Sequence, residues 1–116
     1  MARLNFVELP VKDIAATQTF YETAFGFGMT AFGPTYACTL TGDVDLGLQA
    51  DASEATKAPL AVIQVDDLEA ALAAVRHAGG KVTRPIFSFP GGRRFQFTDP
   101  SGNELSAMQA DPAGDH

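Results

Sequence analysis

The chain has 116 residues, with 14 acidic against eight basic side chains and a net charge of −6 at pH 7. This negative balance argues against nucleic acids and anionic membranes as partners. A hydrophobic content of 46% with nine Phe predicts one packed domain. The single Cys38 excludes an internal disulfide, and no signal peptide follows Met1, so we expect a cytoplasmic protein.

The first half of the chain predicts a strand, a helix and three short strands. Leu4 to Val11 alternates in part, Asp13 is a good N-cap, and Gly26 ends the helix. Residues at helical spacing form its apolar stripe, and we expect Tyr21 among them to lie in the core. The stripe consists of Ile14, Thr17, Phe20, Tyr21 and Ala24. The three strands are expected at residues 29–32, 36–41 and 45–48.

The second half repeats this order after a polar, Ala-rich segment at residues 51–59. Residues 60–65 predict a strand, and Asp66 or Asp67 caps a helix that Gly79-Gly80 ends. A strand begins at residues 81–83. We expect an extended loop at residues 85–92.

The last element predicted is a hairpin around the turn Asp99-Pro100-Ser101-Gly102-Asn103. Asp99 can accept backbone N–H bonds there, and Gly102 tolerates a positive φ. Strands on either side, at residues 94–97 and 105–108, pair antiparallel. Alternation places Arg94 and Gln96 on one face of the sheet and Phe95 and Phe97 on the other.

Shifting the chain on itself by 54 residues aligns the two halves. Val11 then falls on Val65, Asp13 on Asp67, Ile14 on Leu68, Gly26 on Gly80 and Phe6 on Leu60. Such self-similarity predicts two copies of one strand–helix–three-strand unit. Module one covers about residues 1–50, the linker 51–59, module two 60–109, and a flexible tail 110–116.

The order of these motifs resembles the vicinal-oxygen-chelate superfamily, the group of glyoxalases, bleomycin-resistance proteins and extradiol dioxygenases. The matching residues are Val11-Lys12-Asp13-Ile14, Phe20-Tyr21, Phe25-Gly26-Phe27, Val65-Asp66-Asp67-Leu68, Gly79-Gly80 and Asp99-Pro100-Ser101-Gly102-Asn103. The resemblance implies an α+β fold of two βαβββ modules, which form a curved, cup-shaped mixed sheet with helices on the outside.

The resemblance also implies where a divalent metal would be held, and this chain departs from that pattern. The family's two His positions fall on Phe6 and Leu60, and its Glu position falls on Ser106. None of these is a good ligand for a divalent metal. We therefore expect no metal and no cofactor, with Glu8 and Glu104 as an atypical Mg²⁺ pair left open.

Glu8 shares a strand face with Phe6 and is the candidate catalytic residue. A carboxylate enclosed in the cup suits a general base; alternatively, it is a structural ion that pairs with Arg94 or binds a backbone amide. Arg94 could grip a carboxylate or phosphate, or stay solvated, and Gln96 offers a donor and an acceptor.

The remaining candidates would line the pocket wall. Phe87 and Phe89 close over an apolar ligand or tuck into the edge of the core, and Cys38 is a small buried hydrophobe rather than a nucleophile. The full set of predicted ligand-binding residues is Phe6, Glu8, Tyr36, Cys38, Leu60, Phe87, Phe89, Arg94, Gln96 and Ser106.

Two functions are consistent with this set. The first is a metal-free binding protein that sequesters an aromatic or cationic small molecule. The alternative is a metal-independent isomerase, epimerase or lyase in which Glu8 is the base. The open sheet edges predict a homodimer.

Overall fold

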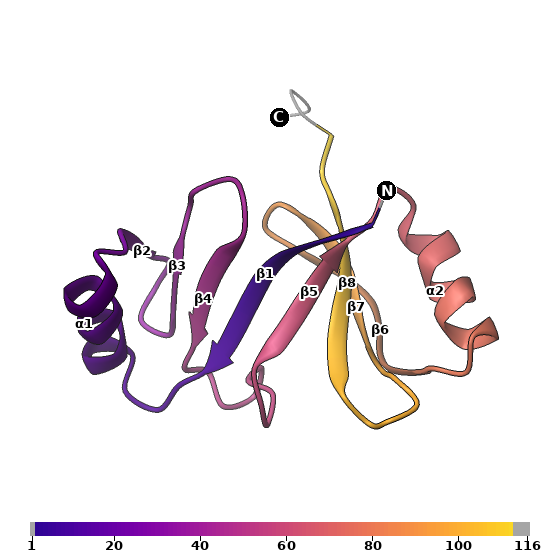
Figure 1. Ribbon diagram of the computed structural model, residues 1–116, viewed down its shortest axis with the longest axis horizontal. Coiled ribbons are helices and arrows are strands. Elements are labelled where there is room, and N and C mark those ends of the chain that lie inside the picture. The colour runs from indigo at the N-terminus through magenta and orange to yellow at the C-terminus, as the bar shows by residue number, and fades with distance from the viewer. Residues whose placement is uncertain (1, 113–116) are drawn as a thin grey trace. The chain divides into compact units, whose positions relative to one another are not determined.

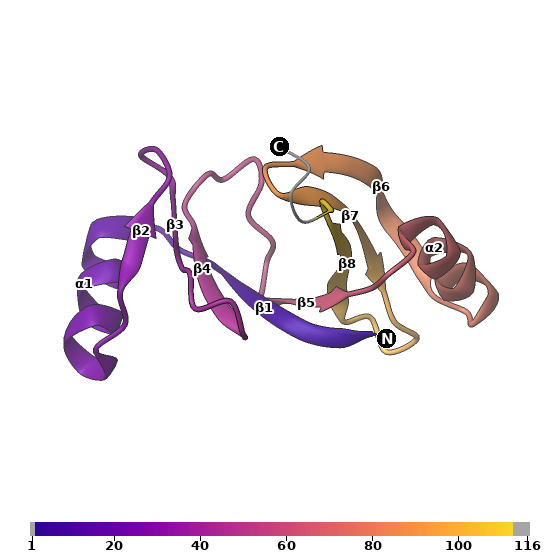
Figure 2. The same cartoon turned by 90° about the horizontal axis from the view of Figure 1, so that it is seen from above.

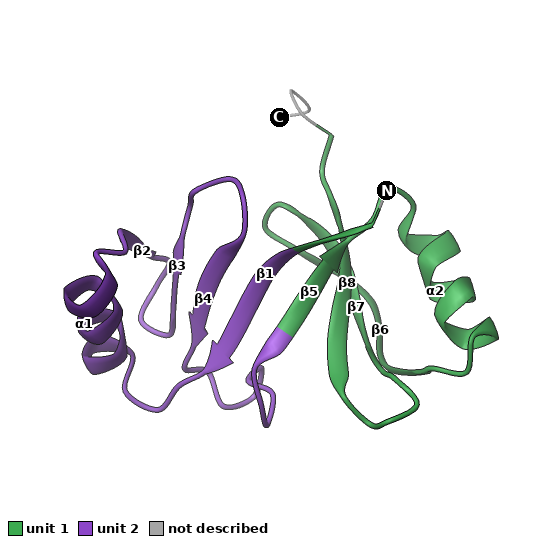
Figure 3. Ribbon diagram, in the orientation of Figure 1, with its two compact units in different colours: residues 1–4, 61–116 green, residues 5–60 purple. Residues whose placement is uncertain are grey.

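The computed structural model describes residues 2–112, which fold as two compact units (Figure 3). Of the described residues, the first unit comprises 2–4 and 61–112, and the second comprises 5–60. Of the flexible tail predicted at residues 110–116, residues 113–116 lie outside the described part. Within residues 2–112, no helix is both long and apolar enough to span a membrane.

The second unit contains a mixed sheet in the strand order β2-β3-β4-β1, with helix α1 beside it (Figure 1). β1 (Arg3–Pro10) runs parallel to β4 (Asp45–Gln49). β4 is antiparallel to β3 (Tyr36–Thr39), which is antiparallel to β2 (Met29–Ala31). The predicted strands are confirmed, each to within two residues of its expected ends.

Helix α1 (Ile14–Phe25) begins and ends at the predicted residues. Asp13 caps it by accepting a hydrogen bond from the Ala16 N–H at 3.0 Å. Gly26 ends it at φ 72°, in the left-handed region that favours glycine. None of its side chains is buried, so the predicted apolar stripe does not form a closed core with the sheet.

The first unit repeats the plan in the order β5-β8-β7-β6. Its strands are β5 (Leu60–Gln64), β6 (Lys81–Phe89), β7 (Gly92–Thr98) and β8 (Glu104–Ala110), except that Leu60 itself is grouped with the second unit. Helix α2 (Leu68–His77) contacts β6, β7 and β8 (Figure 2). Of the two candidate caps, Asp67 is the one that accepts from the Ala70 N–H, at 3.0 Å.

A closed apolar core joins α2 to its sheet. Leu68, Phe95 and Ala107 are buried at its centre, and Val75 and Phe97 are among the side chains that pack around them. Phe95 and Phe97 thus share one face of β7, as alternation predicts, and that face is the one covered by α2. The opposite face of β7 is left for the polar side chains.

The predicted turn between β7 and β8 is confirmed in its hydrogen bonds. Asp99 Oδ1 accepts from the N–H groups of Ser101 and Asn103, each at 2.9 Å. Gly102 has φ 88°, while Asn103 donates its side-chain amide to Asp99 Oδ2 at 2.9 Å. The hydrogen bond from this amide, followed by the backbone ones, holds the pKa of Asp99 below its ordinary value.

The prediction of an extended loop at residues 85–92 is wrong, because residues 85–89 belong to β6. Phe87 pairs with Arg94 and Phe89 with Gly92 in an antiparallel ladder. The register shifts between Arg84 and Phe87, which leaves Pro85 at an irregularity where its missing N–H is tolerated. A proline at such a position does not end a strand.

The α+β class and the two βαβββ modules are confirmed by these elements. Residues 51–59 contain turns and bends but no helix or strand, as expected of a linker. The module bounds and the cup, which depends on how the modules sit together, stay predictions.

Candidate functional site

In the second unit, Glu8 is brought together with two other predicted site residues. Glu8 is only 3 % exposed, and its Oε2 accepts a hydrogen bond from Tyr36 Oη at 3.2 Å. Gly47 pairs with Glu8 across the β1–β4 ladder. A Cβ on Gly47 would lie 2.6 Å from both Phe6 Cζ and Tyr36 Oη, so the glycine makes room for both rings.

Cys38 lies in the same row of the sheet, because it pairs with Gly47 from the other side. Its side chain is buried, and burial raises the pKa of the thiol, with a further contribution from the Asp45 charge. The thiol is thus kept protonated at neutral pH, which agrees with a buried hydrophobe rather than a nucleophile.

In the first unit, Gln96 and Ser106 face each other across the β7–β8 ladder. Both are buried, and Ser106 Oγ donates to the Phe95 carbonyl at 3.0 Å. Gln96 Nε2 donates to Glu104 Oε2 at 3.1 Å, and Thr83 Oγ1 donates to the same oxygen at 2.9 Å. Gln96 Oε1 is buried and finds no hydrogen-bond donor within residues 2–112.

The aromatic candidates of the first unit lie beneath guanidinium groups. Phe87 lies 3.6 Å from Arg84 Cζ and 5.1 Å from Arg94 Cζ, measured to the ring centroid. Phe89 lies 5.6 Å from Arg94 Cζ. These distances are typical of cation–π contacts, so Arg94 is not a freely solvated side chain.

The side chain of Arg93 points to the opposite face of the sheet from that of Arg94 and pairs with Glu69 on α2. Its Nη1 and Nη2 donate to the two carboxylate oxygens at 2.6 and 3.1 Å. This fork holds the pKa of Glu69 low and that of Arg93 high. Arg93 therefore belongs to the helix side of the unit.

The three positions at which the resemblance would place metal ligands do not fit a divalent cation. Phe6 offers a ring, Leu60 a fully buried aliphatic side chain, and the Ser106 hydroxyl is engaged with a backbone carbonyl. Within residues 2–112, no three His, Cys, Asp or Glu side chains are grouped closely enough to hold a metal.

The predicted site residues thus fall into two groups, one in each unit. Phe6, Glu8, Tyr36, Cys38 and Leu60 lie in the second, and Phe87, Phe89, Arg94, Gln96 and Ser106 in the first. That both groups line one hollow stays a prediction.

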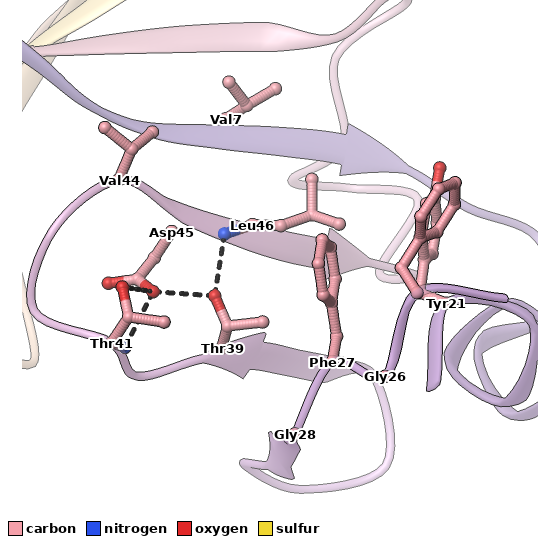
Figure 4. A pocket seen from close by; sticks show the side chains of 11 residues that line it. Val7, Tyr21, Gly26, Phe27, Gly28, Thr39, Thr41, Val44, Asp45 and Leu46 are labelled. Carbon is pink, nitrogen blue, oxygen red and sulfur yellow. Dashed lines mark hydrogen bonds between the residues drawn. The ribbon is translucent and has the colours of Figure 1, made fainter. Parts of the chain in front are cut away.

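A pocket that the sequence did not indicate lies on the other face of the second unit's sheet. Val7 and Leu46 form part of its lining, and alternation along β1 places Val7 opposite to Phe6 and Glu8. The pocket has a volume of about 540 Å³ and opens beside the C-terminal end of α1 (Figure 4). Its lining residues are Val7, Tyr21, Phe25, Gly26, Phe27, Gly28, Thr39, Thr41, Val44, Asp45 and Leu46.

Asp45 supplies the carboxylate of this pocket and is held by its neighbours. Its Oδ1 accepts from Thr39 Oγ1 at 2.7 Å, and from the N–H and Oγ1 of Thr41 at 2.8 and 2.7 Å. Gly42 N–H donates to Oδ2 at 3.2 Å. Partial burial works to raise the pKa of Asp45, but these hydrogen bonds outweigh it and lower the pKa below its ordinary value.

Local signals for this pocket were present in the sequence. The run Thr39-Leu40-Thr41-Gly42-Asp43-Val44-Asp45 places hydroxyls at a spacing from which they can bond an aspartate, and Phe25 and Phe27 flank the end of a helix. Tyr21 was expected in the core but instead lines the pocket and is half-buried. The expectation failed because α1 does not close onto the sheet there.

Comparison with curated proteins gives two relatives that share one name. The chain is 30% identical over 117 residues to "Putative glyoxylase CFP32" of Mycobacterium bovis, and equally to the Mycobacterium tuberculosis protein of that name. The match covers 91% of this chain and 45% of each relative, so the chain spans about half the length of the curated relatives it matches.

Solved structures share the fold at lower identity. Methylmalonyl-CoA epimerase from Mycobacterium tuberculosis has a TM-score of 0.73 at 17% identity, covering 94% of this chain and 88% of its own. The Mn(II)-bound glyoxalase from Novosphingobium aromaticivorans has a TM-score of 0.70 at 21% identity, covering 94% of this chain and 40% of its own. A family model matches residues 3–106, and the chain therefore belongs to the Glyoxalase/Bleomycin resistance protein/Dioxygenase superfamily.

Proposed function

We propose that the chain is a small-molecule-binding member of this superfamily that recognises an aromatic or cationic compound without a metal at the three family positions. The observation that carries the proposal is the buried Oε1 of Gln96, which has no donor within residues 2–112. Buried acceptors that lack a donor are rare and costly, and a bound ligand is one way to satisfy them.

The surroundings of Gln96 define the ligand's chemistry. An N–H group on the ligand would donate to Gln96 Oε1, and the adjacent Glu104 carboxylate favours a positive charge on that group. Ser106 is fully buried opposite Gln96, so the strand pair offers a rigid support. On the neighbouring strand, Arg84 pairs with Gln96 and lies with Arg94 over the Phe87 ring, so the ligand would meet these cationic groups as well as the Glu104 carboxylate.

The proposal is tested by titrating ¹⁵N-labelled full chain with a panel of aromatic amines and amidines. A true ligand moves the amide signals of Gln96 and Ser106 in a saturable manner. Gln96→Leu is expected to weaken the binding of that ligand by about tenfold, because the hydrogen-bond acceptor is lost from a buried site. Gln18→Leu is the matched control, since Gln18 is a half-buried glutamine on α1, in the other unit, whose side chain bonds Glu22 at 3.3 Å. An affinity that Gln96→Leu leaves unchanged would contradict the proposal.

A second function is favoured by the burial of Glu8. As a general base, Glu8 would take a proton from a carbon next to a carbonyl group, leaving an enolate, and return it to either face. This is the chemistry of an isomerase or epimerase, and the fold shared with methylmalonyl-CoA epimerase is compatible with it. The assay incubates each ligand in D₂O and follows exchange of that C–H by NMR. If Glu8→Gln abolishes the exchange, Glu8 is supported as the general base. If the exchange survives in Glu8→Gln, that role is rejected.

We further infer a homodimer in the cytoplasm. The curated relatives are about twice as long as this chain, and a second copy would supply a comparable length. Sedimentation equilibrium gives the mass directly, and a monomer at micromolar concentration would reject the inferred homodimer.

A further inference from the structure

The pocket of the second unit lies on the face opposite to Glu8 and has no part in the function proposed above. Its volume of about 540 Å³ lies within the range of ligand sites. It is lined chiefly by apolar and aromatic side chains, with Thr39, Thr41 and Asp45 gathered at one end and Tyr21 at the other (Figure 4). A cavity of this composition can enclose an apolar body and orient one polar group.

Its wall is aromatic. Tyr21 and Phe27 are stacked with ring centroids 6.1 Å apart and an interplanar angle of 9°. Phe25 adds a third ring, 5.8 Å from Phe27. Phe25 and Phe27 are 64 % and 40 % exposed, so their ring faces are available to a ligand. Such faces attract organic cations as well as aromatic rings.

The electrostatics of the pocket are negative. Its lining includes the Asp45 carboxylate and no Lys, Arg or His side chain. The four hydrogen bonds to Asp45 keep it charged at neutral pH. A cation that reached Oδ2 would compete with one bond only, the 3.2 Å contact from Gly42 N–H.

The end of α1 adds to this negative field. The C-terminus of a helix carries a partial negative charge from its carbonyl groups. The last turn of α1 has no basic side chain, whereas the last turn of α2 has Arg76 and His77. Phe25 and Gly26, which form this helix end, also line the pocket. The helix thus leaves its terminal charge to be balanced from outside.

We propose that this pocket is a second binding site, which takes a small organic cation with an apolar or aromatic body, such as an alkylammonium or benzylammonium compound. The body lies against Phe27, Val7 and Leu46, and the cationic group lies between the rings and Asp45. Unlike the ligand proposed for the Gln96 face, this one needs no N–H donor.

Benzyltrimethylammonium chloride is the probe, because its quaternary nitrogen has no N–H to offer Gln96. Titrated into ¹⁵N-labelled full chain at constant ionic strength, it is expected to shift the amides of Gly28, Thr41 and Leu46 with a dissociation constant of about 1 mM or tighter. The amides of Gln96 and Ser106 are expected to stay in place. Benzyl alcohol, the neutral comparison, is expected to bind about fivefold more weakly, since it lacks the cation–π term.

Two variants locate the site. Phe27→Leu removes one aromatic ring and is expected to raise the dissociation constant of the probe by about fivefold. Phe32→Leu is the matched control, because Phe32 is 54 % exposed but does not line the pocket. Asp45→Asn is expected to raise the dissociation constant of the probe by about threefold, because the negative charge is lost. If Asp45→Asn fails to fold, Phe27→Leu decides alone.

Three results would overturn the proposal. Shifts that remain linear into tens of millimolar, or equal binding of benzyl alcohol, would show that no cation site exists. Shifts centred on Gln96 would assign the probe to the other face. The Thr41 and Leu46 amide signals could also move with protein concentration and stay unchanged when the probe is added. That result would show that a second copy of the chain covers this pocket.

Discussion

Tyr36 donates its phenolic hydrogen to Oε2 of Glu8 at 3.2 Å, joining β3 to β1 across the glycine of the strand between them. The bond holds a carboxylate that is almost wholly removed from water. Hydrogen bonds to charged groups contribute more than neutral ones, and their loss inside a protein is correspondingly costly.

Tyr36→Phe is accordingly expected to lower the free energy of unfolding by about 1.5 kcal/mol, because it removes a donor to a buried charge. Urea denaturation followed by circular dichroism measures this loss. Tyr21→Phe is the control, since Tyr21 makes ring contacts but no hydrogen bond of its hydroxyl is seen within residues 2–112. A loss as large in Tyr21→Phe would show that the effect is unrelated to Glu8.

Gly47→Ala is expected to destabilise the protein by about 1–3 kcal/mol, the usual cost of overpacking. The new methyl group would lie 2.6 Å from Phe6 Cζ and Tyr36 Oη, and both rings would have to move. Gly28→Ala should be neutral, because a Cβ there meets nothing within 4 Å. Thermal unfolding of the two variants makes the comparison, and equal melting temperatures would contradict the packing around Gly47.

Asp67→Ala is expected to cost about 1 kcal/mol through loss of the cap on α2. Asp67→Ser retains a capping oxygen and should recover most of that loss. The two variants are compared by urea denaturation. If both lose the same free energy, the 3.0 Å bond to the Ala70 N–H does not stabilise the helix.

Asp99 gives the stability a pH dependence of defined sign. Its pKa is lowered in the folded state, first by the Asn103 side chain, so the unfolded chain binds protons more readily. The contribution of Asp99 is present above the ordinary aspartate pKa and is lost as the pH falls through the lower, folded-state value. Melting temperatures between pH 5 and pH 2 should therefore fall less steeply for Asp99→Asn than for the parent chain.

Asp99→Asn can still accept the bonds from Ser101 and Asn103, so the turn is retained. Asp111→Asn is the control, because Asp111 is exposed and its carboxylate, although its charge acts on Arg93, makes no hydrogen bond within residues 2–112. A parent chain and Asp99→Asn with parallel acid profiles would reject the linkage.

Local patterns were sufficient to predict what local forces determine. The caps at Asp13 and Asp67 and the turn at Asp99 each depend on residues no more than four positions apart. Strand alternation was also sufficient to predict that Phe95 and Phe97 share one face of β7, whereas the core around Leu68 shows that this face is the helix side.

The failures involve non-local packing. Pro85 suggested a loop, but pairing with β7 extends the strand past it through a register shift. Tyr21 has the spacing of a core residue, yet whether α1 closes onto its sheet depends on side chains from three strands. The Asp45 pocket was missed for the same reason, although its hydrogen-bonding run is contiguous in sequence.

The two helices differ in how firmly they are anchored: α2 buries Leu68 in a closed core, whereas no side chain of α1 is buried. Segments with few buried contacts open by themselves at a small free-energy cost, without unfolding the rest of the chain. Amide hydrogens along α1 should therefore exchange with deuterium well before those of α2, making one helix a breathing element and the other a fixed one.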